Sequence, residues 1–349
     1  MSGKKAYIKS FAAASPSFCV SQKEAGEFLM ERYAGRLSTR GARILKVLFA
    51  HPSIKRRAFA LDRPDELVEE DADRRIARFT RESIKLSAQA LRAALEGAGI
   101  SPYELRGIIV NTCTGYICPG VSTYLIERLG LRRDIKAFDL VGAGCGGAMP
   151  NLEMAGLLAR NGPVASISVE ICTATFQMAD ELTLLLSNTL FADGAAAAIV
   201  AEDAGGLEIM GSAAYFAPEQ RESIRYVHRG GQLFNQLHDD LPELVKDASA
   251  KVACGLLTRM GLDKQDIKHW AVHAGGEKII NAVREGVGLS PEQAAPARRV
   301  LEGYGNMSSP TVWFVLREIM ERGIGSGEFC MLLSFGAGLS AHACLLRKT

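Results

Sequence analysis

The chain has 349 residues, with 41 basic and 39 acidic side chains, which gives a formal net charge of +2. This near balance offers no global reason to expect nucleic acid or an anionic membrane as a partner, so any anion recognition must be local. The length exceeds one typical hydrophobic core and predicts two domains or one large duplicated α/β body. No apolar run approaches the roughly 20 residues of a membrane span, so no membrane insertion is expected.

The N-terminus and the cysteines bear on the compartment. Lys9 interrupts the first apolar stretch before a signal-peptide core can form, which argues against secretion. The cysteines form neither a CxxC pair nor a Cys/His cluster at zinc spacing, so we expect reduced thiols, a cytoplasmic protein and no bound metal. They lie at positions 19, 113, 118, 145, 172, 254, 330 and 344.

In the first half of the chain, predicted helices alternate with predicted strands. Apolar spacing and glycine stops predict helices over 21–47, 74–95 and from Cys145 to 161. Apolar runs predict buried strands over 106–111 and 164–171, and Asp193-Gly194 is typical of a turn before another apolar strand.

The second half shows the same alternation, with helices expected over 241–260, 277–285 and 307–321, and strands over 267–272, 330–334 and 342–346. The acidic and glycine-containing segment 202–206 is the best candidate boundary, which gives halves 1–206 and 207–349. Each half contains a strand, a glycine turn with a reactive side chain, and a helix. We therefore expect an internally duplicated α/β fold.

Cys145 stands where an apolar strand changes through a glycine cluster into an amphipathic helix. Glycines allow a sharp turn, and the exposed N–H groups of a helix N-terminus favour an anion, so this position suits a reactive thiolate of lowered pKa. A cysteine is more often a small buried residue without chemistry. The flanking glycines and the strand-to-helix change favour the nucleophile.

Two further glycine-flanked polar residues, His273 and Asn306, follow the ends of predicted elements in the second half. An imidazole stabilises a cysteine thiolate as an ion pair, and an amide beside it would donate to an oxygen that becomes negative during reaction. Each has a simpler explanation, a core histidine bonded to backbone and a helix cap before 307–321. Together with Cys145 they predict a nucleophile, its partner and an oxyanion hole.

At these residues the chain resembles the type III polyketide synthases (chalcone synthase-like) of the thiolase superfamily. The resemblance extends over nearly the whole chain, and its motifs occur in the family's order. They are residues 11–24, Asn111-Thr-Cys-Thr-Gly-Tyr-Ile-Cys-Pro-Gly120, the Cys145 segment, Glu170-Ile-Cys-Thr-Ala-Thr-Phe176, Leu190-Phe-Ala-Asp-Gly-Ala195, His273-Ala-Gly-Gly276, Gly303-Tyr-Gly-Asn-Met-Ser-Ser309 and Ser334-Phe-Gly-Ala-Gly-Leu339.

The resemblance implies a thiolase-like duplicated αβαβα layered fold, a homodimer, and acyl-CoA and malonyl-CoA as substrates without a metal or bound cofactor. It implies that Cys145 carries the acyl chain while His273 and Asn306 stabilise the oxyanion and the enolate formed when malonyl-CoA loses CO₂. The related β-ketoacyl-ACP synthase III enzymes usually have His-Gln-Ala-Asn where this chain has His273-Ala-Gly-Gly. That difference favours the polyketide synthase branch. A single condensation of the β-ketoacyl-ACP synthase III or hydroxymethylglutaryl-CoA synthase type is the alternative activity, and intact Cys145, His273 and Asn306 argue against an inactive acyl-binding homologue.

The resemblance also assigns pocket residues. Phe191 matches a gatekeeping phenylalanine between the CoA tunnel and the cavity, although it could equally be a core residue. A second gate falls at Phe234 or Asn235, and spacing to Pro242 favours Asn235. The remaining pocket positions carry mostly small side chains, which leave volume for a fatty acyl starter and an alkylpyrone or alkylresorcinol product. Cys113, Thr114 and Cys118 match positions that line the cavity or reach it across the dimer interface. Another wall contains Cys172, Ala174 and Thr175, and the asparagine motif adds Ser308.

The phosphates of CoA require basic side chains at the tunnel mouth. Arg36, Arg40 and Arg43 share one face of the helix expected over 21–47, with Lys46 and Lys55 close by. We expect Arg40, Arg43, Lys46 and Lys55 to bind CoA, although a merely solvated basic face would give the same pattern.

Overall fold

The computed structural model describes residues 5–349, and within them nine strands form one sheet in the order β11-β12-β13-β8-β1-β7-β6-β4-β5. Residues 1–4, on which the expectation about secretion partly depends, lie outside the described range. The sheet strands are β1 (Ala6–Ala14), β4 (Gly107–Asn111), β5 (Lys136–Leu140), β6 (Val164–Ile171), β7 (Asp193–Ala201), β8 (Leu207–Phe216), β11 (Ile267–Val272), β12 (Phe329–Gly336) and β13 (Ser340–Lys348). Two antiparallel pairs lie outside it, β2 (Phe18–Ser21) with β3 (Arg56–Phe59), and the hairpin of β9 (Ile224–Arg229) and β10 (Gln232–Leu237).

Helices of two kinds connect these strands. The α-helices are α1 (Gln22–Arg32), α2 (Thr39–Phe49), α3 (Ala72–Ala98), α4 (Val121–Arg128), α5 (Ala148–Leu158), α6 (Leu182–Leu190), α7 (Leu241–Met260), α8 (Glu277–Val287), α9 (Pro291–Tyr304) and α10 (Thr311–Arg322). The short 3-10 turns are η1 (Pro64–Val68), η2 (Pro102–Glu104), η3 (Gly144–Gly147), η4 (Ala159–Asn161), η5 (Cys172–Thr175), η6 (Pro218–Gln220) and η7 (Lys264–Asp266).

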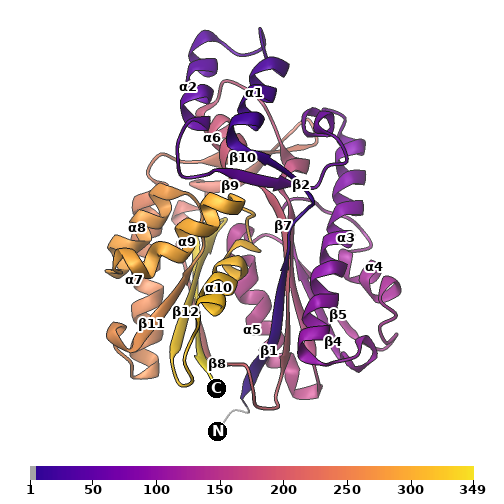
Figure 1. Ribbon diagram of the computed structural model, residues 1–349, viewed down its shortest axis with the longest axis vertical. Coiled ribbons are helices and arrows are strands. Elements are labelled where there is room, and N and C mark those ends of the chain that lie inside the picture. The colour runs from indigo at the N-terminus through magenta and orange to yellow at the C-terminus, as the bar shows by residue number, and fades with distance from the viewer. Residues whose placement is uncertain (1–4) are drawn as a thin grey trace.

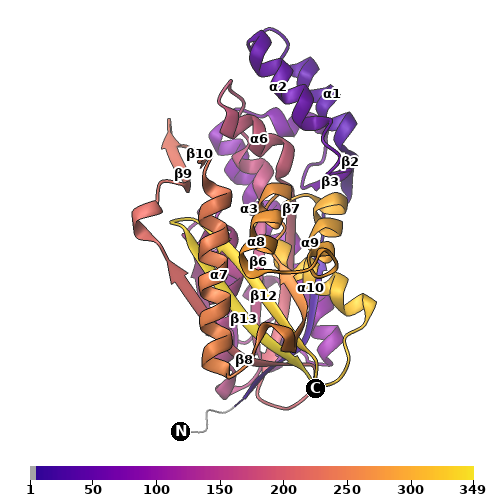
Figure 2. The same ribbon diagram turned by 90° about the vertical axis from the view of Figure 1, so that its left-hand side faces the viewer.

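The helices form three layers around the two parts of the sheet. Helices α3 and α4 cover the outer face of the first part, whereas α7, α8 and α9 lie on the opposite side of the molecule (Figure 1). Helices α5 and α10 contact strands of both parts and therefore fill the space between them. Figure 2 shows α7 running along β8, β12 and β13. The order is helix, sheet, helix, sheet, helix.

The two halves of the chain meet where β1 pairs with β8, from Ala6 opposite Ile209 to Ile8 opposite Leu207. In the first half β4 runs parallel to β5 and β6, and β7 is antiparallel to β1 and β6. In the second half β11 runs parallel to β12, and β13 is antiparallel to β12 and β8. The turn with Cys145 thus follows β5 in the first half, and His273 follows β11 in the second half, and each of these strands runs parallel to its neighbour.

Burial explains which strands the sequence revealed. Strands β6 and β7 are buried along their whole length, because helices cover both faces of the sheet there. Strand β7 is almost continuously apolar after Asp193, whereas β6 alternates apolar residues with Ser166, Ser168 and Glu170. The expected strand at 164–171 and helix at 241–260 coincide with β6 and α7, so these predictions are confirmed. Strand β5, at the edge of the sheet, is largely exposed.

Three expected elements were wrong in detail. The single helix over 21–47 is two helices, because Gly35 has a φ of +78° and Ser38 caps a new helix by accepting from the N–H of Gly41. Asp193-Gly194 is no turn but the buried start of β7. The helix expected from Met307 begins only at Thr311, after Pro310, so Asn306 does not cap it.

Candidate active site

Cys145 lies on η3, between strand β5 and helix α5. Gly142 and Gly144, with φ of +94° and +56°, turn the backbone sharply before it. The carboxyl end of β12 packs directly on this turn: a Cβ on Gly336 would lie 2.0 Å from the carbonyl oxygen of Ala143. The nucleophile turn is therefore held by backbone from the second half of the chain.

His273 follows the last residue of β11 and is 1% exposed. Its backbone N–H donates to the carbonyl of Leu333 on β12 at 2.8 Å, and its ring stands edge-on to Phe335 at a centroid distance of 5.1 Å. Neither ring nitrogen has a hydrogen-bond partner among the described residues. Because a buried imidazole without partners is costly, these nitrogens are available to a bound substrate.

Asn306 lies in the turn between α9 and α10, and its amide is fixed from both sides. Its Oδ1 accepts from the N–H of Ser308 at 2.8 Å, and its Nδ2 donates to the carbonyl of Gly275 at 3.2 Å. The amide NH₂ carries two hydrogens, so one donor remains for another acceptor. The backbone of Asn306 also bonds with Leu190 and Ala192, on either side of Phe191, at 2.9 and 2.8 Å.

The structure brings Cys145, His273, Asn306 and Phe191 to the wall of one cavity of about 320 Å³. Much of the remaining wall is aliphatic and comes from α2, α6, β9, β10, α7 and α8. These side chains are Leu48, Ile54, Leu182, Leu186, Leu190, Ile224, Leu237, Leu241 and Ile279. We call this space the outer cavity.

Burial dominates the electrostatics of the nucleophile. It raises the pKa of Cys145 to about 12, while a hydrogen bond with Ser308 acts in the opposite direction. Burial alone lowers the pKa of His273 to about 3. Our expectation that the helix N-terminus lowers the thiol pKa is therefore wrong. Burial favours the neutral form of each group, and only a combined thiolate–imidazolium pair would offset the cost of both charges.

Phe191 separates the outer cavity from an inner pocket, because its side chain lines both. The inner pocket also contains Cys172, Thr175 and Asn235, but its volume is only about 30 Å³. Tyr226 narrows it: this tyrosine is half-buried in the pocket wall, and its hydroxyl oxygen lies 3.3 Å from Oγ1 of Thr175. The expectation that small side chains leave a large inner space is wrong, because Tyr226 takes up that space. Sequence spacing gave no sign of this tyrosine.

The second gate position falls on Asn235. On β10 it pairs with Tyr226 of β9, and its Nδ2 donates to Oγ of Ser187 at 3.1 Å. Phe234, next along the strand, lines a different cavity and lies under the guanidinium of Arg229 at 5.1 Å. Because successive strand residues point to opposite faces, only Asn235 reaches the inner pocket.

Cys113, Thr114 and Ser308 come together through a buried carboxylate. Glu170 accepts from the N–H of Cys113 at 2.9 Å and from Oγ1 of Thr114 at 2.9 Å, and it also accepts from Oγ of Ser309 at 2.7 Å. Sγ of Cys113 lies 3.5 Å from Oγ of Ser308, which in turn bonds with Cys145. Sequence reasoning gave Glu170 no role, although its place before Ile171-Cys172 in a buried strand marks an unusual carboxylate.

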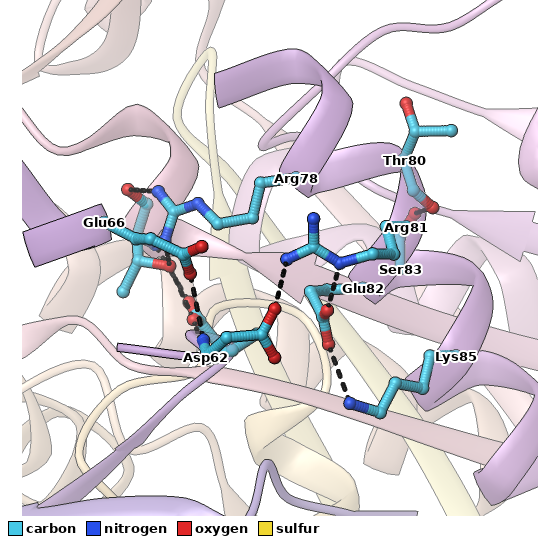
Figure 3. A network of polar contacts seen from close by, with 11 residues as sticks. Asp62, Glu66, Arg78, Thr80, Arg81, Glu82, Ser83 and Lys85 are labelled. Atoms are coloured by element: carbon cyan, nitrogen blue, oxygen red, sulfur yellow. Dashed lines mark hydrogen bonds and ion pairs between the residues drawn. The ribbon is translucent and has the colours of Figure 1, made fainter. Parts of the chain in front are cut away.

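The wall bearing Cys172 and Thr175 is anchored from helix α3. Arg78 donates to Oγ1 and the carbonyl of Thr173 at 3.1 and 2.8 Å, and Thr173 bonds with the buried carboxylate of Asp193. Figure 3 shows Arg78 beside a surface network in which Arg81 bridges Asp62 and Glu82. These contacts fix η5 as part of the scaffold.

Some expected site residues lie elsewhere. Cys118 is exposed on the loop after β4 and lines neither cavity, and Thr114 is locked between Glu170 and the N–H of Ile171. Arg40, Arg43, Lys46 and Lys55 are exposed near the outer cavity but are not part of its wall, and Lys55 pairs with Glu302. Arg36 is in the loop before α2, so it does not share a helix face with Arg40.

Sequence reasoning missed several polar residues of the outer cavity, among them Lys278 on α8, His51 after α2 and His238 after β10. Lys278 follows the His273 motif directly and is exposed, which a search for cations near that motif could have found. Within residues 5–349, no three His, Cys, Asp or Glu side chains lie together as metal ligands would. No helix in that range is both long and apolar enough to span a membrane.

The fold, and the cavity that Cys145, His273 and Asn306 share, fit one class of enzyme, the condensing acyltransferases. Two family models match the chain, "FAE1/Type III polyketide synthase-like protein" over residues 15–208 and "Chalcone and stilbene synthases, C-terminal domain" over residues 208–349. The chain belongs to the type III polyketide synthases, which are decarboxylating condensing enzymes that use acyl-CoA and malonyl-CoA. The resemblance seen in the sequence is thereby confirmed.

Individual relatives agree with this family. The chain is 30% identical to 3,5-dihydroxyphenylacetyl-CoA synthase of Streptomyces toyocaensis, over 87% of this chain and 83% of that protein. The crystal structure of PKS-I from the brown alga Ectocarpus siliculosus superimposes with a TM-score of 0.90 at 26% identity, covering 99% and 98% of the two chains. The fold of 1,3,6,8-tetrahydroxynaphthalene synthase from Streptomyces coelicolor A3(2) is shared with a TM-score of 0.89 at 21% identity, covering 98% and 99%. The expected thiolase-like fold is confirmed.

Proposed function

We propose that the chain loads a fatty acyl-CoA starter on Cys145 and extends it with malonyl-CoA to alkylpyrone or alkylresorcinol products. The observation that carries the condensation is the outer cavity, where Cys145, His273 and Asn306 face one space and His273 has two unpartnered ring nitrogens. The aliphatic wall of the same cavity supports an alkyl starter, because apolar surface there is removed from water by an alkyl chain.

The residues perform the reaction in three steps. The Cys145 thiol gives its proton to His273 and attacks the starter carbonyl, and CoA leaves as the thiol after the tetrahedral oxyanion collapses. Malonyl-CoA then binds and loses CO₂, and the electron pair left behind forms an enolate whose oxygen accepts from His273 and Asn306. The enolate carbon attacks the acyl-Cys145 thioester, forms the new C–C bond and releases the thiolate. These steps use side chains and CoA thioesters alone, without a metal or bound cofactor.

Two variants test these roles. Cys145→Ala should abolish condensation of acyl-CoA with malonyl-CoA, because no thioester can form on the enzyme. His273→Gln should keep part of the starter loading but lose most malonyl decarboxylation, since the two steps use the imidazole differently. Loading is measured as radiolabelled protein and decarboxylation as released CO₂. Condensation at a normal rate by Cys145→Ala, or equal retention of both steps by His273→Gln, would refute the assignment.

A short starter is a second candidate, and the inner pocket of about 30 Å³ favours it, because a long chain has no room there while Tyr226 is in place. Mass analysis of products from acyl-CoA thioesters of increasing length, each with malonyl-CoA, separates the two. Turnover that rises with alkyl length supports the fatty starter, whereas preference for short or aromatic thioesters such as coumaroyl-CoA contradicts it. The number of malonyl units per product separates iterative extension from a single condensation.

We also propose that CoA phosphates are held near α2 and α8, by Lys278 together with Arg40, Arg43, Lys46 or Lys55. The outer cavity opens between these elements, and phosphate groups are well matched by such cations.

The eight cysteines are all free, which supports a reducing cytoplasmic location. The division into halves 1–206 and 207–349 agrees with a nucleophile from one half and its partners from the other.

A further inference from the structure

A second cavity, of about 490 Å³, lies apart from Cys145, His273 and Asn306. It is formed by the loop between α1 and α2, the start of α3, the segment after η5 and the tip of the β9–β10 hairpin. We call it the arginine pocket, after its lining residues Arg36, Arg75 and Arg229, which stand with Tyr33, Phe234 and Gln177. Only Gln177 is shared with the inner pocket of the active site.

Arg75 is the unusual member of this pocket. Arg75 is only 6% exposed, and burial lowers the pKa of its guanidinium. The guanidinium donates to the backbone carbonyl of Glu69 and to Oε1 of Gln232 at 3.1 Å, which are both neutral oxygens. A buried charge that bonds only to neutral groups is costly, and an anion in the pocket would remove that cost.

The carboxylates of Glu69 and Glu70 attract the Arg75 guanidinium but do not bond to it, and Glu69 pairs with Arg74. Arg36 pairs with Glu70 at 2.6 Å, and Arg229 pairs with Glu181 at 2.6 Å outside the pocket lining. The wall therefore carries three guanidinium groups but one carboxylate, and that carboxylate already has a close partner.

The remaining wall suits an apolar body attached to the anion. The guanidinium of Arg36 lies 5.7 Å from the ring centroid of Tyr33, and that of Arg229 lies 5.1 Å from that of Phe234. Leu37 and Met178 add apolar surface, and Gln177 donates to Gln232 at 2.5 Å at the inner end. Stacked guanidinium and aromatic groups bind planar carbon frameworks, and a guanidinium fork matches a carboxylate. The volume is that of an ordinary small-molecule site.

We propose that the arginine pocket binds a small organic carboxylate with a planar apolar body, and that Arg75 receives its carboxylate. The guanidinium of Arg75 would recognise the carboxylate in the same way whether the acid is a product of this enzyme or of another reaction. The proposal does not depend on the starter, and it remains testable if the condensation scheme fails.

Benzoate and benzamide form a matched pair of probes, equal in ring and size but different in charge. In titration calorimetry with the full chain, benzoate should bind saturably at one site, and benzamide at least tenfold more weakly. Benzoate binding should survive alkylation of Cys145 with iodoacetamide, because the arginine pocket is separate. Equal affinity for the two probes, tighter binding of inorganic phosphate than of benzoate, or no saturable binding would overturn the proposal.

Variants locate the site. Arg75→Gln should weaken benzoate binding at least tenfold, and Arg229→Gln, at a half-exposed position where folding is not at risk, at least threefold. Arg225→Gln is the matched control, because Arg225 lies on the same hairpin and pairs with Glu222 but does not line the pocket. Unchanged binding in Arg229→Gln, or an equal loss in Arg225→Gln, would refute the assignment. Displacement of benzoate by the enzyme's own acidic products would identify them as the ligand.

Discussion

Cys145 and His273 illustrate how a half-buried thiol and a buried imidazole depend on each other. Burial raises the pKa of the thiol to about 12 and lowers that of the imidazole to about 3, so either ion alone is disfavoured. Transfer of the thiol proton to the ring creates both charges in one cavity, where their attraction opposes the cost of burial. The reactivity of the thiol should therefore belong to the pair and not to Cys145 alone.

The pH dependence of alkylation tests this coupling. In His273→Gln the thiolate loses its counter-charge while burial remains, so the pKa of Cys145 moves toward its buried value and less thiolate exists at neutral pH. We expect iodoacetamide to inactivate this variant at least roughly tenfold more slowly at pH 7, with a rate that still rises beyond pH 9. His269→Gln, which removes a histidine paired with Glu328 on the far end of β11, is the control. Identical pH profiles for wild type and His273→Gln would disprove the coupling.

Tyr226 is the residue that limits the inner pocket. It faces Thr175 and Asn235 and leaves about 30 Å³ between them. Tyr226→Ala should open this space and shift the products to longer starters or to more malonyl units, as measured by mass analysis. The cavity should lower the stability by about 3–5 kcal/mol. Tyr215→Ala, which removes a tyrosine bound to Lys251 on α7, is the control. An unchanged product distribution in a folded Tyr226→Ala enzyme would exclude this role.

At the scale of elements, the end of β12 and the nucleophile turn η3 fit without spare room. A Cβ on Gly336 would lie 2.0 Å from the carbonyl oxygen of Ala143 and 2.5 Å from the nitrogen of Gly146, which are both backbone atoms. Backbone cannot move aside as a flexible side chain can, so any added methyl group must displace the turn that carries Cys145. The glycine is required by close approach and not by a positive φ.

Gly336→Ala should therefore lower activity, because it displaces the turn that carries Cys145. We expect a loss of about 1–3 kcal/mol in stability and a fall in kcat of roughly a hundredfold, since a displacement near 1 Å at the nucleophile has that effect. Steady-state kinetics and chemical denaturation measure the two quantities. Gly303→Ala in α9, where nothing lies within 4 Å of the new methyl group, should leave both nearly unchanged. Near-normal kcat in Gly336→Ala would contradict the tight packing.

The elements also show what sequence could and could not predict. Buried strands such as β6 and long helices such as α7 have strong apolar patterns, and their limits were predicted correctly. Cys145, His273 and Asn306 stood out because glycines flank them at element ends, and the structure brings them to one cavity. Tyr226 was missed because a tyrosine in a short exposed-looking strand carries no pattern, and its role depends on the partner strand and η5. The break at Gly35 was missed because apolar spacing continues across it.

At the scale of the whole molecule, one sheet joins the two halves, and one of its two edge strands, β5, precedes the Cys145 turn. Strand β5 is the last strand of the sheet and exposes Lys136 to Asp139, with Phe138 at 36% and the following Val141 at 63% exposure. The loop carrying Tyr116 and Cys118 projects next to it, since β4 pairs with β5. An open strand edge with apolar side chains favours pairing with another chain.

We therefore propose that the expected homodimer forms through β5, with the Cys118 loop at the same interface. Phe138→Glu would place a charge on each copy of a two-fold contact, so association should weaken by roughly a hundredfold, measured by analytical ultracentrifugation. Leu157→Glu changes an equally apolar side chain, 62% exposed at the end of α5, and should leave the dimer intact. Because Cys145, His273 and Asn306 all come from one chain, starter loading should persist in the Phe138→Glu monomer. A dimer of wild-type strength in Phe138→Glu, or dissociation only in Leu157→Glu, would place the interface elsewhere.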